Sequence, residues 1–125
     1  MKAYGSIPVD DEWLERARQD LQLAALALGA DLVAGAAFHI QQALEKGLKA
    51  LLMAEGMRPP RTHDLEALAA SLATPPTAFT AAELAEASAW ALSGRYPGMD
   101  EDLPSTARVG ETLRKAQAWL KTLAP

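Results

Sequence analysis

The side chains best suited to chemistry fall on one short segment near the middle of the chain, where amides, a carboxylate and two ammonium groups share one face of a helix. They are Gln41, Gln42, Glu45, Lys46 and Lys49. Glu45 and Lys49 stand four residues apart in the favourable order, so one interpretation of this face is a solvated ion pair. The other is a binding surface, because Phe38 falls on the same face and an aromatic ring beside amides and lysines is typical of an interface.

Two further groups of side chains could bind a ligand together with this face. His63 is a titratable residue in a basic turn with Arg61, although capping and packing of a helix would also account for it. Arg95 and Tyr96 follow a predicted helix end. They could hold a phosphate or stack on a base, or Arg95 could simply interact with the last carbonyls of the helix.

Several kinds of site are missing from the sequence. There is no phosphate-binding loop, dinucleotide-binding motif, zinc-protease motif or serine-hydrolase motif. There is also no cysteine, which excludes disulfides and thiolate ligands. His39 and His63 have no carboxylates at ligand spacing, and we interpret His39 as a boundary residue bonded to water or to a neighbour. We therefore expect no metal and no cofactor, and we assign no catalytic residue.

The size and charge of the chain limit its partners. With 125 residues, half of them hydrophobic, it should form a single domain over residues 1–125. A net charge of −4 argues against broad capture of nucleic acid, yet a local basic patch is expected where Lys46, Lys49, Arg58 and Arg61 lie close in sequence. The absence of a signal-peptide pattern and of a long apolar run predicts a cytoplasmic protein without membrane contact.

Hydrophobic periodicity predicts five helices and no strand. The first helix should begin at a cap, Asp10 or Asp11, and end near Gly29; the second should begin at the cap Asp31 and end at Gly56. The third should begin at a cap, Thr62 or Asp64, and end near Leu72. The fourth is expected from Thr80 to Gly94, and the fifth from a first turn containing Pro104 to Leu123. The clearest start is the capping box of Thr80 and Glu83. The sequence thus predicts an all-α, up-and-down helical bundle of four main helices plus a short additional helix.

The second of these helices has a wide apolar arc that should face the core. The opposite arc is polar and is expected at the surface; it consists of Gln41, Gln42, Glu45, Lys46 and Lys49. Gly47 falls within the apolar arc, where the missing side chain lets another helix approach closely.

Four segments resemble the HEPN domain family in the family's order. The most specific is the helix segment 37–50, AFHIQQALEKGLKA; the others are Trp13 with Ala17 and Asp20-Leu21, the turn Arg61-Thr62-His63-Asp64-Leu65, and Arg95-Tyr96-Pro97. The resemblance implies a helical bundle that is frequently a homodimer. It also implies a small prokaryotic protein encoded beside a minimal nucleotidyltransferase, often as a toxin–antitoxin pair.

Many members of that family are metal-independent ribonucleases, with an arginine followed four to six residues later by a histidine near the start of a late helix. No histidine follows His63 here, so Arg95 has no such partner. Arg58 and His63 match the bare spacing, but Pro59 and Pro60 lie between them, and we interpret the match as coincidence.

The sequence therefore predicts a binding module, the partner of a minimal nucleotidyltransferase, that binds a nucleotide or RNA through a basic patch. The residues assigned to that patch are Gln41, Gln42, Lys46, Lys49, Arg61, His63, Arg95 and Tyr96. The first alternative is a metal-independent ribonuclease toxin, in which His63 is the general base and Arg58 or Arg95 stabilises the transition state. The second is a purely structural dimerisation protein.

Overall fold

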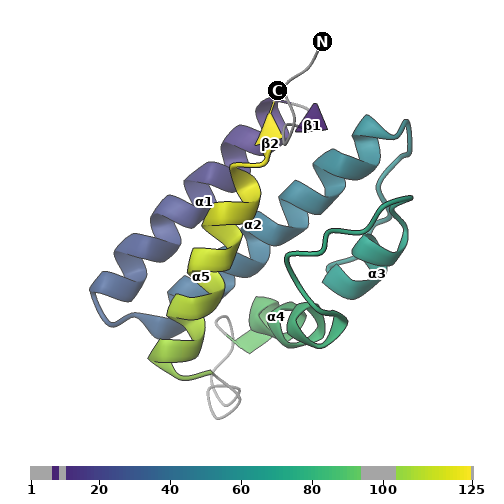
Figure 1. Cartoon of the computed structure of the whole chain (residues 1–125). Coiled ribbons are helices and arrows are strands. Elements are labelled where there is room, and N and C mark those ends of the chain that lie inside the picture. Colours follow the sequence, from purple (N-terminus) through teal and green to yellow (C-terminus); the bar gives the residue numbers. More distant parts are fainter. Residues whose placement is uncertain (1–6, 9–10, 94–103, 125) are drawn as a thin grey trace.

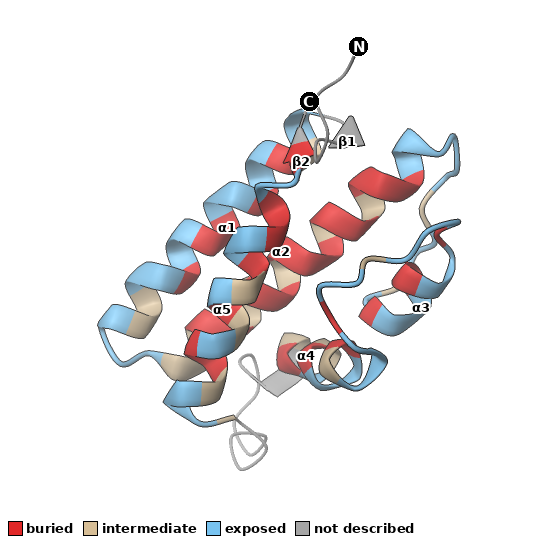
Figure 2. Ribbon diagram, in the orientation of Figure 1, coloured by how far each residue is buried: buried red, intermediate tan, exposed pale blue. Residues whose placement is uncertain are grey.

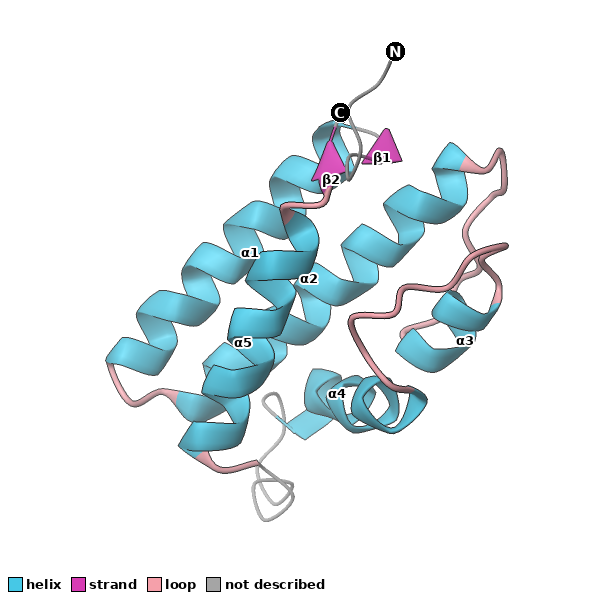
Figure 3. Ribbon diagram, viewed as in Figure 1, coloured by secondary structure: helices cyan, strands magenta, loops and turns pink. Residues whose placement is uncertain are grey.

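Helices account for most of the chain in the computed structural model, which describes residues 7–8, 11–93 and 104–124 (Figure 1). In chain order the elements are β1 (Ile7–Pro8), α1 (Asp11–Gly29), α2 (Val33–Ala54), α3 (Leu65–Ala70), α4 (Ala81–Ser93), α5 (Thr106–Leu120) and β2 (Leu123–Ala124). The all-α prediction, with four long helices and one short one, is confirmed (Figure 3). Within the described ranges, no helix has both the length and the apolar character needed to cross a bilayer.

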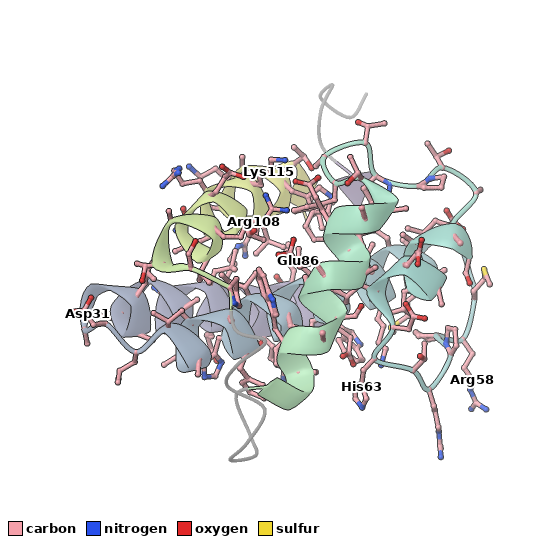
Figure 4. All side chains as sticks on the ribbon, turned by 90° about the horizontal axis from the view of Figure 1, so that it is seen from below. Asp31, Arg58, His63, Glu86, Arg108 and Lys115 are labelled. Atoms are coloured by element: carbon pink, nitrogen blue, oxygen red, sulfur yellow. The ribbon has the colours of Figure 1, made fainter. Side chains whose placement is uncertain are left out.

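The helices are arranged around α2. α1, α2 and α5 lie side by side, whereas α4 is viewed almost along its axis in Figure 1 and runs across the other helices in Figure 4. α2 contacts each of the other four helices. It is therefore buried over most of its circumference, while α1 presents one buried face and one exposed face (Figure 2).

Local signals explain where three helices begin. The Asp64 side chain accepts a hydrogen bond from the Ala67 amide (3.2 Å) and caps α3, as expected. At α4 both bonds of the predicted capping box are formed, from Thr80 N to Glu83 Oε1 (2.8 Å) and from Glu83 N to Thr80 Oγ1 (3.1 Å). α5 differs from the prediction, because its cap is Ser105 and the preceding Pro104 lies outside the helix.

The turn between α1 and α2 also departs from the prediction. Asp31 does not cap α2; it has a φ of +61°, in the left-handed region that aspartate tolerates better than most residues. Leu32 is the N-cap and makes no side-chain cap bond. The turn is closed instead by the backbone, with Leu32 N donating to Ala27 O (2.8 Å). Gly56, with a φ of +81°, follows the end of α2 as expected.

A short parallel strand pair joins the two ends of the chain. Ile7 pairs with Leu123 and Pro8 with Ala124, and Figure 1 shows both strands at the same end of the molecule. The prediction that no strand is present is wrong in this detail, because strands of two residues are too short to show an alternating pattern.

α5 packs closely on α2 at the position that the sequence indicated. A Cβ built on Gly47 would lie 2.7 Å from Cη2 and 2.8 Å from Cζ3 of Trp119. Trp119 is 7% exposed and makes an edge-on contact with Phe79, so its ring is held on more than one side. The bare backbone at Gly47 is thus what lets the indole lie against α2.

We predict that Gly47→Ala destabilises the fold by about 1–3 kcal/mol, because the added methyl overpacks a fixed ring. Gly35→Ala is the matched control in the same helix, since its Cβ would meet Ala27 Cβ at an ordinary 3.8 Å. It should stabilise by roughly 0.5–1 kcal/mol through helix propensity. Urea denaturation measures both, and equal effects of the two substitutions would contradict the packing argument.

Candidate functional site

A strip of half-buried polar side chains runs along α2, spaced three and four residues apart. It consists of His39, Gln42, Lys46 and Lys49, and is called the polar strip below. α1 borders it on one side and the turn of residues 61–64 on the other, because side chains from both contact it or the residues beneath it. The strip thus occupies the narrow part of α2 that other elements leave accessible.

On the α1 side, the strip is anchored by the buried carboxylate of Asp20. The side chain of Asp20 is 8% exposed, and its Oδ1 lies 2.9 Å from Nδ1 of His39. Its Oδ2 accepts a hydrogen bond from Nζ of Lys46. A carboxylate only accepts, so His39 donates through Nδ1. Asp20 is buried here because it shares the apolar face of α1 with Ala17 and Ala24.

On the turn side, the corresponding anchor is Glu45, whose side chain is 10% exposed. Its Oε2 accepts from Lys49 Nζ (2.9 Å), and its Oε1 lies 2.8 Å from His63 Nδ1 and 3.1 Å from Gln41 Nε2. Burial raises the pKa of Glu45, but the hydrogen bonds from Lys49, His63 and Gln41 outweigh it, so the pKa lies below its ordinary value. Glu45 is therefore ionised at neutral pH.

Gln41 links α2 to the turn of residues 61–64 through a buried hydrogen bond. Its side chain is fully buried, donates to Glu45 and to the carbonyl of His63 (3.4 Å), and accepts from Gln42 Nε2 (2.7 Å). The expectation of an exposed polar arc is thus wrong for Gln41 and Glu45. These two residues lie beneath the surface because the turn before α3 packs over their side of α2.

The structure brings most of the predicted binding residues together. Gln42, Lys46 and Lys49 lie in the polar strip and His63, 76% exposed, stands at its edge, so the basic turn does adjoin the helix. Arg61 is exposed in the same turn. The predictions for Arg95 and Tyr96 fall outside the described residues.

The positive charge expected of this surface is reduced by the carboxylates of Asp20 and Glu45. Lys46 is paired with Asp20 and Lys49 with Glu45, so each strip ammonium has a carboxylate beside it. The result is a set of positioned donors rather than a patch of unbalanced charge. Within the described ranges, no three side chains of metal-binding type gather in one place.

Residues of α1 border the polar strip, and they were not singled out from the sequence. Glu12, Trp13 and Arg16 line a hollow of about 320 Å³ together with Lys46. Trp13, Arg16 and Asp20 follow helical spacing on one face of α1, which is the signal that could have assigned them to the site. A larger hollow, about 510 Å³, lies between α1 and α5 and is lined by none of the predicted site residues.

The lowered pKa of Glu45 predicts an acid-dependent contribution to stability. That contribution is present above the unfolded value of 4.5 and is lost as the pH falls through the lower folded value. We expect Glu45→Gln to be less stable than wild type at neutral pH and to lose less stability between about pH 5 and about pH 3. Urea denaturation across that range is the measurement.

The matched control is Glu66→Gln, an exposed carboxylate on α3. It should follow the wild-type pH dependence. Glu83, whose pKa is lowered mainly by the hydrogen bond from Lys115, titrates in all three proteins and leaves a common slope. Parallel curves for Glu45→Gln and wild type would contradict the assignment.

The comparisons with known proteins agree with this fold. The crystal structure of TT1696 from Thermus thermophilus is similar, with a TM-score of 0.70 and 28% sequence identity, covering 89% of this chain and 92% of that chain. No curated protein matches. A model of the HEPN domain matches residues 11–124, from the start of α1 into β2. Because that match takes in every helix described above, this chain belongs to the HEPN domain family.

Proposed function

We propose that this chain is a cytoplasmic HEPN binding module that holds a nucleotide or RNA at the polar strip. The observation that carries the proposal is the anchoring of each strip lysine: Lys46 on Asp20 and Lys49 on Glu45. An ammonium has three donors, so each lysine keeps donors for a ligand after bonding its carboxylate. Phosphate oxygens are suitable acceptors, because charge-assisted hydrogen bonds are the strong ones.

Preorganisation favours binding over a merely solvated face. The side chains of Lys46 and Lys49 are 26% and 13% exposed, so much of their rotamer freedom is already lost in the free protein. A ligand then loses less entropy in ordering them. His39 and His63 add ring nitrogens whose orientation a carboxylate sets.

The proposal includes a protein partner. Membership of the HEPN family supports a homodimer that acts with a minimal nucleotidyltransferase in a toxin–antitoxin pair. The test is co-purification of the tagged chain with a nucleotidyltransferase encoded beside it. A stable complex is expected; a neighbouring nucleotidyltransferase that does not bind would contradict this part.

We predict that ATP or a short single-stranded RNA raises the thermal unfolding temperature of the wild-type chain. The double variant Lys46→Gln/Lys49→Gln replaces each ammonium with a neutral amide and so removes both charges. It should bind at least about tenfold more weakly, as expected for the loss of charge-assisted contacts.

The control is Arg114→Gln, which removes an exposed charge from α5. Arg108 and Lys115 of that helix lie on the side opposite His63 in Figure 4. Arg114→Gln should bind like wild type. Equal weakening by both changes would indicate general electrostatics, and no stabilisation of wild type by either ligand would leave the purely structural alternative.

One observation favours the ribonuclease alternative. Glu45 holds Nδ1 of His63 while the ring is 76% exposed, which leaves Nε2 accessible as a general base. In that reaction Nε2 takes the proton of a ribose 2′-hydroxyl, the freed oxygen attacks phosphorus, and the 5′-oxygen leaves with a proton from water. Arg58 does not complete the arrangement, because it and His63 point outward at separate places in Figure 4.

RNA cleavage in the presence of EDTA distinguishes the two functions. The binding proposal predicts no cleavage by the purified chain. Metal-independent cleavage that is lost in His63→Gln but retained in His39→Gln would replace the binding proposal with the ribonuclease. Cleavage retained in both variants would indicate a contaminating nuclease.

A further inference from the structure

The hollow beside Lys46 has the chemistry of a stacking site. It lies between α1 and the polar strip and is lined by Glu12, Trp13, Arg16 and Lys46. Its volume, about 320 Å³, is at the lower end of small-molecule sites. An indole, a guanidinium and an ammonium around one hollow are the groups that recognise an aromatic ring carrying phosphate.

Trp13 forms a fixed wall of this hollow. It is half-buried and packs against the hydrophobic core, so its ring is positioned before a ligand arrives. Trp90 and Trp119 are 2% and 7% exposed and are enclosed in the core. Trp13 is therefore the tryptophan that a ligand can reach, and every base has a face that can stack on an indole.

The charged side chains around the hollow determine how a bound ligand is oriented. Arg16 is 63% exposed and meets Glu12 through a long 3.5 Å contact, so its guanidinium can turn towards a phosphate at little cost. Lys46 lies at the strip side, fixed by Asp20. The carboxylate of Glu12 repels phosphate, so Arg16 must turn away from Glu12 to bind the phosphates together with Lys46, and the base then lies against Trp13.

We infer that the hollow is a nucleoside-phosphate subsite, in which the base stacks on Trp13 while Arg16 and Lys46 bind the phosphates. The inference rests on the proposed nucleotide or RNA binding at the polar strip and adds where the base lies. It assigns to the site three α1 residues, Glu12, Trp13 and Arg16. Free nucleotide and single-stranded RNA offer the same base, ribose and phosphate.

Tryptophan fluorescence and calorimetry test the subsite on the intact chain. ATP and a short oligoadenylate should quench the emission and reduce its further quenching by acrylamide, because the base covers Trp13. Tripolyphosphate, which has the charge without the nucleoside, should bind at least about tenfold more weakly than ATP. Tighter binding of oligoadenylate than of ATP would identify RNA as the source of the ligand, and the reverse would identify free nucleotide.

Two variants separate stacking from charge. Trp13→Leu keeps an apolar group against the core and should lower ATP affinity by roughly tenfold. Arg16→Ala changes an exposed side chain and should lower it several-fold, whereas Arg18→Ala, the same change on the opposite side of α1, should have no effect. The Arg16 variant keeps the test valid if Trp13→Leu folds poorly.

The outcomes distinguish this inference from the function on which it rests. If ATP binds, and Lys46→Gln/Lys49→Gln abolishes binding while Trp13→Leu and Arg16→Ala leave it unchanged, the subsite is wrong and the polar strip stands. Equal affinities for tripolyphosphate and ATP would also overturn the subsite. If neither ATP nor oligoadenylate binds, both the subsite and the proposed function fall.

Discussion

The burial of Glu45 on the central helix is the constraint on which the site depends. A carboxylate removed from water is costly unless donors surround it, and here the donors come from its own helix and from the turn before α3. The hydrogen bonds to Glu45 therefore hold three side chains in place: Lys49, one turn further along the helix, the buried amide of Gln41, and the ring of His63. The position of the turn and the geometry of the strip are therefore consequences of one buried charge.

Asp20 is a second buried carboxylate that is surrounded by donors, and it lies between α1 and α2. It joins a histidine and a lysine of α2 to a neighbouring helix, as Glu45 joins a lysine of α2 and a histidine of the turn. In both cases the ion pair is half shielded from water, which makes its strength less sensitive to salt than a surface pair. The two clusters hold the strip at both edges, so its side chains are positioned by the fold rather than by a ligand.

Local features of the fold were predictable from sequence, whereas contacts between distant segments were not. The capping box at Thr80 and the close approach at Gly47 depend on neighbouring residues or on one missing side chain, which a pattern can show. Asp31 resembled a cap, but backbone hydrogen bonds close its turn. The burial of Gln41 was hidden because a helical wheel assumes that the polar side faces water, and a turn far along the chain covers it there. The pairing of His39 with Asp20 likewise joins two helices.

The balanced charge of the strip reconciles an acidic chain with an anionic ligand. The chain carries a net charge of −4, so long-range attraction cannot deliver a phosphate to it. Anchored ammonium groups act only at contact distance, and their carboxylates are almost fully buried behind them. A phosphate that reaches the strip therefore meets donors in place, with the like charges shielded beneath. Recognition on such a surface depends on fit at short range, which gives an aromatic wall such as Trp13 more weight than further basic residues would have.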